Sequence, residues 1–498
     1  MNIYTIAEIK AAEKAADDAG HSYAEMMERA GRGVAEAIQQ TYGTAAKRIL
    51  ILVGPGNNGG DGLVAGRYLA EMGAKVLFYL THPREAETDI NFARVQAMGL
   101  ESILADYDQR HRVLRLRLNG CDMVVDALLG TGVSWPITAE LATLLRQVRG
   151  GLHERAGLMA QEQTAVLHPI NQPTPAPPRP LVVAVDCPSG LNCDTGALDP
   201  LALPADLTVT FAGPRPGHLL FPGAAACGRL IVADIGLPNP PSLPTQLATA
   251  ATMRTWLPRR PLDGHKGTFG RVLIAAGSHE YRGAPVLCAL GAFRAGAGLV
   301  AVATPELVRA SAVAQLPEAI YPPLATTEYL DNTAAATLLE TLGQYRALLV
   351  GPGLGSEAEP FVMYLLAGLP TAEKGGNPPI VLDADALNLL AQRADWPHLL
   401  EPNMILTPHM GEMARLCGLE LPEMTAHNRL ELAREKAQAW GCIILLKGAY
   451  TVVANPSGEV VVLPFANPAL ATAGSGDVLS GVIVALLGQG WRRLRRPC

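Results

Sequence analysis

Short apolar strands that end in glycine-rich or acidic loops recur along this chain, and they constrain its fold more than any other feature. The first is Ile49–Val53, which precedes Gly54–Gly62 and an expected amphipathic helix from about Leu63 to Met72. A strand, a glycine loop and a helix in this order cradle phosphates in nucleotide-binding folds. The loop lacks both the usual spacing of an NAD fingerprint and the Gly-Lys-Ser/Thr ending of an ATP-binding loop. The pattern predicts an α/β fold without naming its ligand.

Two more strands in the first half lead into polar glycine turns. The stretch Asp122–Leu129 is mostly apolar, carries the carboxylate of Asp126 and leads into Gly130-Thr131-Gly132. Leu181–Val185 leads into Asp186-Cys187-Pro188-Ser189-Gly190. Because open α/β sheets bind ligands at the carboxyl ends of their strands, both turns strengthen the prediction of a nucleotide site.

The second half repeats the pattern with a longer set of motifs. His265–Gly270 precedes the strand RVLIAA, whereas every other motif follows its strand. These are Gly351–Gly355 after RALLV, Asp383–Asn388 after IVL, Thr407–Glu412 after MIL, and Lys447-Gly448 after CIILL. We therefore expect them at one ligand-binding edge of a sheet.

The segment Asn467–Gly481 has the sequence of an anion site with a carboxylate beside it. Gly474, Ser475 and Gly476 have small or no side chains, so their N–H groups can approach a phosphate at the start of an expected helix, Val478–Leu487. Asp477 then lies in the first helical turn, where it could take a proton from a hydroxyl. The alternative is a glycine turn in which Asp477 only caps the helix.

The ordered motifs of the second half resemble those of the ADP-dependent NAD(P)H-hydrate dehydratases, a branch of the ribokinase-like superfamily, across about Leu262–Gly490. The motifs of the first half, with a helical region around Ala11–Ala37, resemble those of the NAD(P)H-hydrate epimerases. This order is similar to that of the bifunctional NAD(P)H-hydrate repair enzymes. The resemblance implies a Rossmann-like three-layer α/β/α domain followed by a ribokinase-like α/β domain.

The dehydratase resemblance implies that the C6 hydroxyl of hydrated NADH or NADPH (NADHX, NADPHX) is phosphorylated by ADP and then lost, which gives NAD(P)H, AMP and phosphate. Asp477 would be the base. The residues expected at the hydrate are Gly353, Gly355, His409, Gly411, Glu412 and Asp477. The residues expected at ADP are Lys447, Gly448, Ala449, Tyr450, Thr451, Asn467, Pro468, Ala469, Leu470, Ala471, Thr472, Ala473, Gly474, Ser475 and Gly476.

Several of these roles have a plainer alternative. Glu412 could be a carboxylate that only interacts with its helix N-terminus, and Lys447 could be a surface lysine at the end of a strand. The role of Lys266 stays open. Asp383 and Asp385 either hold water or Mg²⁺, or cap the next helix.

The epimerase resemblance implies that the first half interconverts the R and S hydrates, with Asp186 as the acid–base group. The residues expected at this substrate are Asn57, Asn58, Gly59, Gly60, Asp61, Gly130, Thr131, Gly132, Val133, Ser134, Trp135, Pro136 and Asp186. The resemblance also implies a K⁺ ion held by Asn58, Asp126 and Ser189, and oxygen ligands suit such a hard cation. By itself, Asp126 would be an ordinary acid at a strand end.

Proline and glycine indicate the domain limits. We expect an epimerase domain over residues 1–238, a linker over 239–261 with a short helix around Leu247–Trp256, and a dehydratase domain over 262–498. Gly150–Pro180 contains a proline-rich run and is expected to be a partly disordered surface insertion. From residue 491 the chain is arginine-rich and departs from the dehydratase pattern.

Composition limits the alternatives. A chain of 498 residues, 49% hydrophobic and 17% charged, predicts several compact domains. A net charge of −6 and 5% aromatic residues argue against a nucleic-acid partner. The eight cysteines are scattered and include no C-x-x-C pair, which predicts reduced thiols in a cytoplasmic protein. The sequence has no signal-peptide core and no run long enough to span a bilayer, so we expect no membrane partner. We also expect a homo-oligomer.

Two other functions fit parts of the sequence. A vitamin or sugar kinase would share the Gly-Ser-Gly-Asp helix but would keep a phosphorylated product. A non-catalytic scaffold would share the fold of the first half. The presence of Asn57–Asp61, Asp126 and Asp186 favours an enzyme over a scaffold.

Overall fold

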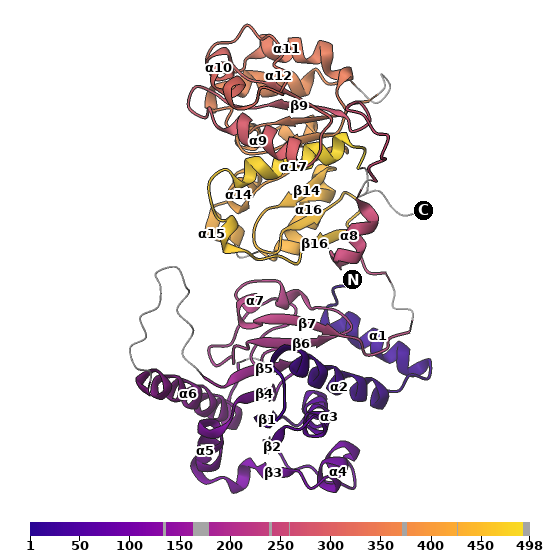
Figure 1. The fold of residues 1–498 in the computed structure, drawn as a ribbon, viewed down its shortest axis with the longest axis vertical. Coiled ribbons are helices and arrows are strands. Elements are labelled where there is room, and N and C mark those ends of the chain that lie inside the picture. Colours follow the sequence, from indigo (N-terminus) through magenta and orange to yellow (C-terminus); the bar gives the residue numbers. More distant parts are fainter. Residues whose placement is uncertain are drawn as a thin grey trace. The chain divides into compact units, whose positions relative to one another are not determined.

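The computed structural model describes residues 1–132, 136–162, 179–238, 242–257, 259–370, 376–425 and 427–491. The chain forms two compact units, Asn2–Leu243 and Pro244–Cys498, and Met1 belongs to the second (Figure 1). Each unit has its own sheet, so the α/β prediction is confirmed for both. In the described part of the chain, no helix is long and apolar enough to cross a membrane.

The first unit is built on a seven-stranded parallel sheet with the order β3-β2-β1-β4-β5-β6-β7. From β1 the chain adds β2 and β3 on one side of the sheet and then crosses over to add β4 on the other side. Folds of this type bind ligands at such a switch point, here between β1 and β4. In register, Leu52 of β1 lies beside Asp126 of β4. The strands are β1 (Arg48–Val53), β2 (Lys75–Leu80), β3 (Glu101–Leu104), β4 (Met123–Ala127), β5 (Leu181–Val185), β6 (Leu207–Phe211) and β7 (Arg229–Ala233).

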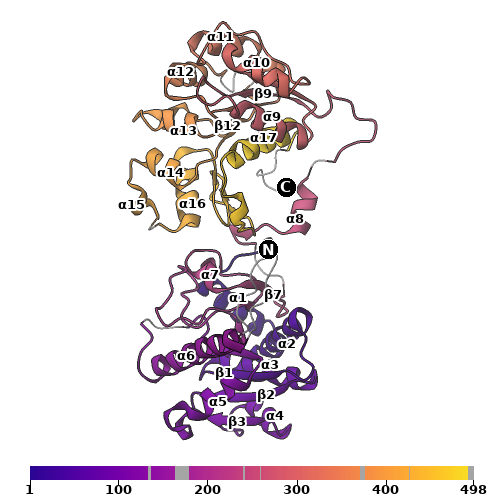
Figure 2. The same cartoon turned by 60° about the vertical axis from the view of Figure 1, so that its left-hand side comes forward.

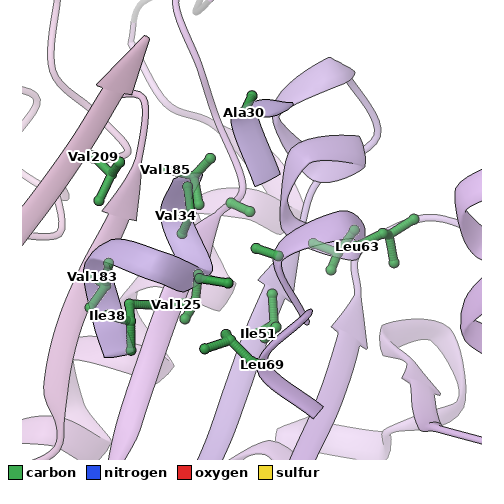
Figure 3. Packing of buried hydrophobic residues seen from close by; sticks show 14 of the residues in the cluster. Ala30, Val34, Ile38, Ile51, Leu63, Leu69, Val125, Val183, Val185 and Val209 are labelled. Carbon is green, nitrogen blue, oxygen red and sulfur yellow. The ribbon is translucent and has the colours of Figure 1, made fainter. Parts of the chain in front are cut away.

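Helices cover both faces of this sheet (Figure 2). The helices of this unit are α1 (Ile6–Asp18), α2 (Tyr23–Tyr42), α3 (Asn57–Glu71), α4 (Ile90–Ala97), α5 (Arg112–Gly120), α6 (Ala139–Glu162) and the short α7 (Gly223–Ala226). Because side chains alternate along a strand, Ile51 packs under α2 and α3 while Leu50 packs under α5 and α6. Figure 3 shows the first of these cores, with Ala30, Val34, Ile38, Ile51, Leu63, Leu69, Val125, Val183, Val185 and Val209.

The glycine run after β1 differs from the prediction. We expected a loop up to Gly62, but α3 begins at Asn57, so Asn57–Asp61 form its first turn. The glycines fit a tightly packed helix: a Cβ on Gly62 would lie 2.5 Å from the Ala127 side chain, and one on Gly66 would overlap the Phe78 ring. Small residues therefore let α3 approach the sheet closely.

The predicted insertion is also corrected. Residues 150–162 belong to α6, which continues to Glu162. The proline-rich part of the insertion, residues 163–178, lies outside the described residues, as does the arginine-rich end, residues 492–498.

The second unit has a nine-stranded sheet with the order β10-β9-β11-β12-β13-β14-β15-β16-β8. The run from β10 to β14 is parallel, β15 pairs antiparallel with both neighbours, and β8 pairs parallel with β16. The strands are β8 (Thr245–Leu247), β9 (Arg271–Ala275), β10 (Leu299–Ala303), β11 (Ala347–Val350), β12 (Ile380–Leu382), β13 (Met404–Leu406), β14 (Ile443–Leu446), β15 (Val452–Ala454) and β16 (Val460–Val462). Because β8 joins this sheet, the predicted linker 239–261 is in part an element of the second unit.

Ten helices of the second unit are described: α8 (Ala250–Trp256), α9 (Ala284–Arg294), α10 (Glu306–Gln315), α11 (Asn332–Thr341), α12 (Glu359–Ala367), α13 (Asp385–Leu390), α14 (Met410–Cys417), α15 (Leu421–Thr425), α16 (Arg429–Trp440) and α17 (Ser475–Gly488). Helix α17 lies beside α9 (Figures 1 and 2); α9 packs on β9 and β10, and α17 packs on β9, β11 and β12. A Cβ on Gly481 would overlap the Cys288 carbonyl, and one on Gly291 would overlap the Val478 carbonyl. The glycines thus bring the two helix backbones together and fix the position of α17.

Candidate functional site

Charged side chains from three strand ends meet helix α17 in the second unit. The Lys447 ammonium, directly after β14, donates to Asp383 Oδ1 (2.7 Å), directly after β12. It also lies 3.5 Å from Glu412 Oε2 in the first turn of α14. The other Asp383 oxygen accepts a hydrogen bond from the Ser480 hydroxyl of α17. Asp383 is 1% exposed, so this network ties α17 to the strand ends inside the unit.

Asp477 lies in the first turn of α17 beside this network. Burial raises the pKa of its carboxyl to about 6, the Asp383 carboxylate adds to the rise, and Lys447 opposes it. Within the described residues its carboxylate accepts no hydrogen bond, so the geometry does not support a purely capping role. A partly buried carboxyl with a pKa near neutrality is suited to accept a proton from a substrate.

The start of α17 offers N–H groups to an anion. Gly474, the residue before the helix, has φ +84°, a conformation that glycine adopts without strain. No described side chain caps the first turn, and the N–H groups of Gly476 and Asp477 have no partners inside the helix. A Cβ on Gly476 would lie 3.7 Å from Lys447 Nζ. The helix N-terminus and an ammonium group therefore adjoin, as a phosphate site requires.

The two segments predicted to hold the nucleotide are connected. Residues 447–451 join β14 to β15, and the Tyr450 N–H donates to the Phe465 carbonyl (2.7 Å). From there Asn467–Ala473, which are exposed, lead into α17. Asn467 Oδ1 accepts from the Ala469 N–H (3.0 Å), which shapes the turn before the helix.

The residues predicted at the hydrate fall into two groups. His409 and Glu412 form a reciprocal cap on α14: His409 Nδ1 accepts from the N–H groups of Gly411 (3.0 Å) and Glu412 (3.3 Å), and Glu412 Oε2 accepts from the His409 N–H (2.8 Å). Glu412 therefore interacts with the N-terminus of its own helix. It is also 4% exposed and contacts Lys447. His409 is exposed.

Gly353 and Gly355 form the second group, in the turn after β11. Their φ angles of +65° and +78° are conformations that favour glycine. The Gly355 N–H donates to Asp385 Oδ2 (3.0 Å), so Asp385 holds this turn against the start of α13.

In the first unit, Asp186 follows β5 and has φ +62°, which is unusual for a residue with a side chain. Its Oδ1 accepts from Thr210 Oγ1 (2.9 Å) and from Arg215 Nη2 (3.4 Å). Arg215 is 1% exposed and also donates to the Gly213 carbonyl (2.6 Å). A buried cation thus holds this carboxylate in one orientation. Sequence analysis missed Thr210 and Arg215, which lie in no local motif, and gave no role to Ser480 within Asn467–Gly481.

Asp61, in the first turn of α3, belongs to the same group of charges. Burial raises its pKa well above the usual value, and the carboxyls of Asp186 and Glu13 raise it further. Burial also raises the pKa of Glu13, while Arg215 lowers it. This edge of the sheet therefore combines an arginine-paired carboxylate with carboxyls that hold their protons more tightly than usual.

The three residues predicted to bind K⁺ lie together. Asp126, at the end of β4, accepts from the Ser189 hydroxyl (2.7 Å) and N–H (2.8 Å). Leu129 links the set, since its N–H donates to Ser189 Oγ (3.1 Å) and its carbonyl accepts from Asn58 Nδ2 (2.9 Å). Among the described residues, the buried Asn58 Oδ1 has no hydrogen-bond partner. Burial raises the pKa of Asp126 to about 6.

The loop after β4 is described only in part. A Cβ on Gly130 would lie 3.2 Å from the Asn58 side chain, so Gly130 adjoins this cluster. Thr131, Gly132 and Pro136 are described, whereas Val133, Ser134 and Trp135 lie outside the described residues.

Comparison with known proteins gives matches over both halves. A family model described as NAD(P)H-hydrate dehydratase matches residues 272–496, and one described as YjeF-related protein N-terminus matches residues 23–217. The chain is 39% identical over 478 residues to the bifunctional NAD(P)H-hydrate repair enzyme of Moorella thermoacetica, covering 93% of this chain and 84% of the relative. It is 33% identical over 482 residues to that of Escherichia coli, covering 96% and 83%.

A solved structure also matches. The ADP/ATP-dependent NAD(P)H-hydrate dehydratase of Bacillus subtilis, crystallised with ATP and Mg²⁺, is 32% identical to this chain. The match covers 50% of this chain and 87% of that protein, with a TM-score of 0.41.

Proposed function

We propose a residue-level mechanism from the premise that this chain belongs to the bifunctional NAD(P)H-hydrate repair enzymes. The chain is an epimerase and a nucleotide-dependent dehydratase of hydrated NADH and NADPH. We assign epimerisation to the first unit, near the predicted domain 1–238, and dehydration to the second.

The dehydratase step rests above all on Asp477. Its carboxyl has a raised pKa and lies in the first turn of α17, next to unpaired N–H groups and Lys447. Asp477 takes the proton of the C6 hydroxyl as that oxygen is phosphorylated, while the amides of Gly474–Gly476 stabilise charge on the transferred group. The turn of Gly353 and Gly355 and the cap of His409, Gly411 and Glu412 form the hydrate side.

ADP is the proposed donor, and AMP and phosphate leave with the repaired coenzyme. Residues 447–451 and 467–476 hold the nucleotide. Lys447 is only partly free for this task, because Asp383 and Glu412 already pair with it. Burial lowers its pKa, but the two carboxylates outweigh burial and raise it overall, so it stays charged.

Mg²⁺ fits Asp385 better than Asp383. Both Asp383 oxygens are engaged, by Lys447 and by Ser480, whereas Asp385 Oδ1 makes only a long 3.4 Å contact with Asn388. No cluster of three His, Cys, Asp or Glu side chains suited to a metal occurs in the described ranges. The ion would neutralise phosphate charge when it is bound with the nucleotide.

Asp186 is the proposed acid–base group of the epimerase. Arg215 and Thr210 orient its carboxylate, and residues 57–61 and 130–136 hold the substrate around it. Asp61 contributes a second carboxyl that keeps its proton more readily than usual.

A potassium ion fits the cluster of Asn58, Asp126 and Ser189. The buried Asn58 oxygen has no hydrogen-bond donor in the described ranges, and Asp126 is fully buried, so a monovalent cation would satisfy the first and neutralise the second. When bound, K⁺ would supply a fixed positive charge beside the substrate loop. The protein residues themselves position Leu129 and Gly130 through Ser189 and Asn58.

One assay tests this proposal. Purified protein is incubated with R or S hydrate, with and without nucleotide, and the absorbance of reduced nicotinamide is followed. We expect S hydrate to be repaired only with nucleotide, R hydrate to be repaired after epimerisation, and ADP to act better than ATP at equal concentration. Equal turnover with ATP would contradict the ADP assignment. A stable phosphorylated product would indicate a kinase instead.

A further inference from the structure

A partly buried arginine lies behind the loop of residues 447–451. Arg429, the first residue of α16, donates to three carbonyls at the end of β14 and beyond it: Ala449 (2.6 Å), Lys447 (3.1 Å) and Leu446 (3.2 Å). The planar guanidinium fork can reach several acceptors at fixed angles, which a lysine ammonium on its flexible stem cannot. Three carbonyls within four residues of backbone are thereby tied to one side chain.

This position is unfavourable for an arginine in every other respect. A cation at a helix N-terminus opposes the helix dipole. Burial lowers the pKa of the Arg429 guanidinium, and its buried Nε has no hydrogen-bond partner in the part of the chain that the structure describes. Among the described residues no carboxylate forms an ion pair with it. The three hydrogen bonds to carbonyls offset these costs, so the structural role of Arg429 is to hold this loop.

The bonds also determine which way the loop amides point. The carbonyls of Leu446, Lys447 and Ala449 face Arg429, and the Gly448 carbonyl accepts from Thr451 Oγ1 (2.8 Å). In the described part of the chain, the N–H groups of Gly448 and Ala449 have no partner. Gly448 has φ +147°, and a Cβ there would lie 2.7 Å from Arg429 Nη2. In a trans peptide the N–H points opposite to the preceding carbonyl, so the Gly448 N–H, which follows the Lys447 carbonyl, points away from the arginine.

We propose that Arg429 is a positioning residue for the nucleotide: it holds the carbonyls of Leu446, Lys447 and Ala449, so that the loop sets its free amides and the Lys447 side chain for the donor phosphates. This inference rests on the proposed assignment of residues 447–451 to the nucleotide. In this role Arg429 acts through the loop rather than on either substrate.

The test measures ADP affinity by calorimetry on the full chain, without hydrate, for Arg429→Met, Arg429→Lys and a matched control. The control is Arg434→Met, on the same helix, because Arg434 donates to Gly458 and Thr245, away from the loop. We expect Arg429→Met to weaken ADP binding about 10-fold or more, because a displaced loop loses its geometry. Arg429→Lys should recover only part of this loss, and Arg434→Met should stay within about twofold.

Kinetics separate positioning from general damage. In Arg429→Met the KM for ADP should rise much more than the KM for the hydrate, and epimerisation should be unchanged. Unaltered ADP affinity in a cooperatively melting Arg429→Met protein overturns the inference. If that variant does not fold, Arg429→Lys decides, and ADP binding equal to that of the unmodified protein overturns it too.

The Lys447→Met variant separates the positioning role of Arg429 from the assignment of residues 447–451 to the nucleotide. If it weakens ADP binding and the Arg429 variants do not, only the positioning role fails. If Lys447→Met and the Arg429 variants all bind ADP normally, the assignment of the loop to the nucleotide fails as well.

Discussion

Two buried or partly buried carboxyls have a pKa raised to about 6, and their surroundings give them different tasks. Asp126 is fully buried and hydrogen-bonded to Ser189, near the Asn58 amide oxygen, which has no donor among the described residues; this suits a bound cation. Asp477 accepts no hydrogen bond within the described residues and adjoins Lys447 and the start of α17. Similar pKa values therefore do not imply similar chemistry, because the neighbouring donors determine what each carboxylate can bind.

Replacing Asp477 by Asn tests its role as the base. The side chains have nearly the same size, so the variant should fold and bind ADP, but Asn cannot accept a proton near neutral pH. We expect dehydration of S hydrate to fall by about 10²–10⁴-fold, measured as the return of reduced-nicotinamide absorbance. Epimerisation by the same protein is the control. Near-normal turnover would show that Asp477 is not the base and direct the search to Glu412, His409 and Asp385.

The pKa of Asp477 predicts a pH dependence. The base must be ionised, so kcat/KM for dehydration should rise with pH through about 6 and become level above it. The sign follows from the direction of the shift: burial favours the protonated form, which is inactive as a base, and this form dominates below the raised pKa. A rate profile over acidic to neutral pH at saturating ADP measures this. A dehydration rate that falls as pH rises through this range would contradict the assignment.

At the scale of secondary-structure elements, some parts of the fold could be predicted from the sequence and others could not. Apolar runs bounded by glycine or acidic residues predicted β5, β12 and β13 at their observed limits, because buried parallel strands need continuous apolar residues. The predicted start of α3 was wrong, because a glycine run has low helix propensity. Close packing of these glycines on Ala127 and Phe78 explains why they are helical in the fold.

Partners from distant elements were beyond prediction. Ser480, Arg215 and Arg429 reach strand-end groups that lie 97, 29 and 17 to 20 positions away in sequence. A serine inside an apolar helix and an arginine at a helix start carry no local signal of such contacts. The motifs thus predicted which strand ends carry functional groups, and the tertiary fold determined what orients them.

The packing of α17 on α9 gives a prediction for a whole element. In Gly481→Ala the added Cβ would overlap the Cys288 carbonyl, which is backbone and cannot rotate away. Helix α17 must shift, so we expect the second unit to lose about 1–3 kcal/mol of unfolding free energy in urea, with weaker dehydration and normal epimerisation. Gly343→Ala is the control, because nothing lies within 4 Å of a Cβ there. Equal stability of both variants would mean that the close approach of α17 and α9 is not required.

The whole molecule combines two units that each have a separate sheet and core. The charges of Asp186 and Arg215 belong to the first unit, and those of Asp477, Lys447 and Asp383 belong to the second. No residue that we assign to one reaction contributes to the other. The chemistry of the two reactions should therefore be separable by single substitutions in the intact chain, although one chain carries both.

This separation predicts complementation between two variants. The Asp186→Asn variant should lose epimerisation, because the proton-transfer group of the epimerase is missing, so R hydrate should persist. It should still dehydrate S hydrate, because Asp477 is intact. Asp477→Asn should interconvert R and S hydrates without consuming them. Mixed in one tube, the variants should repair both hydrates, since S hydrate formed by one protein can diffuse to the other. Chromatography of the two epimers over time measures each step, with thermal melts to confirm folding. If a folded Asp186→Asn protein has also lost dehydration of S hydrate, the reactions are coupled and the independent assignment of the two units is wrong.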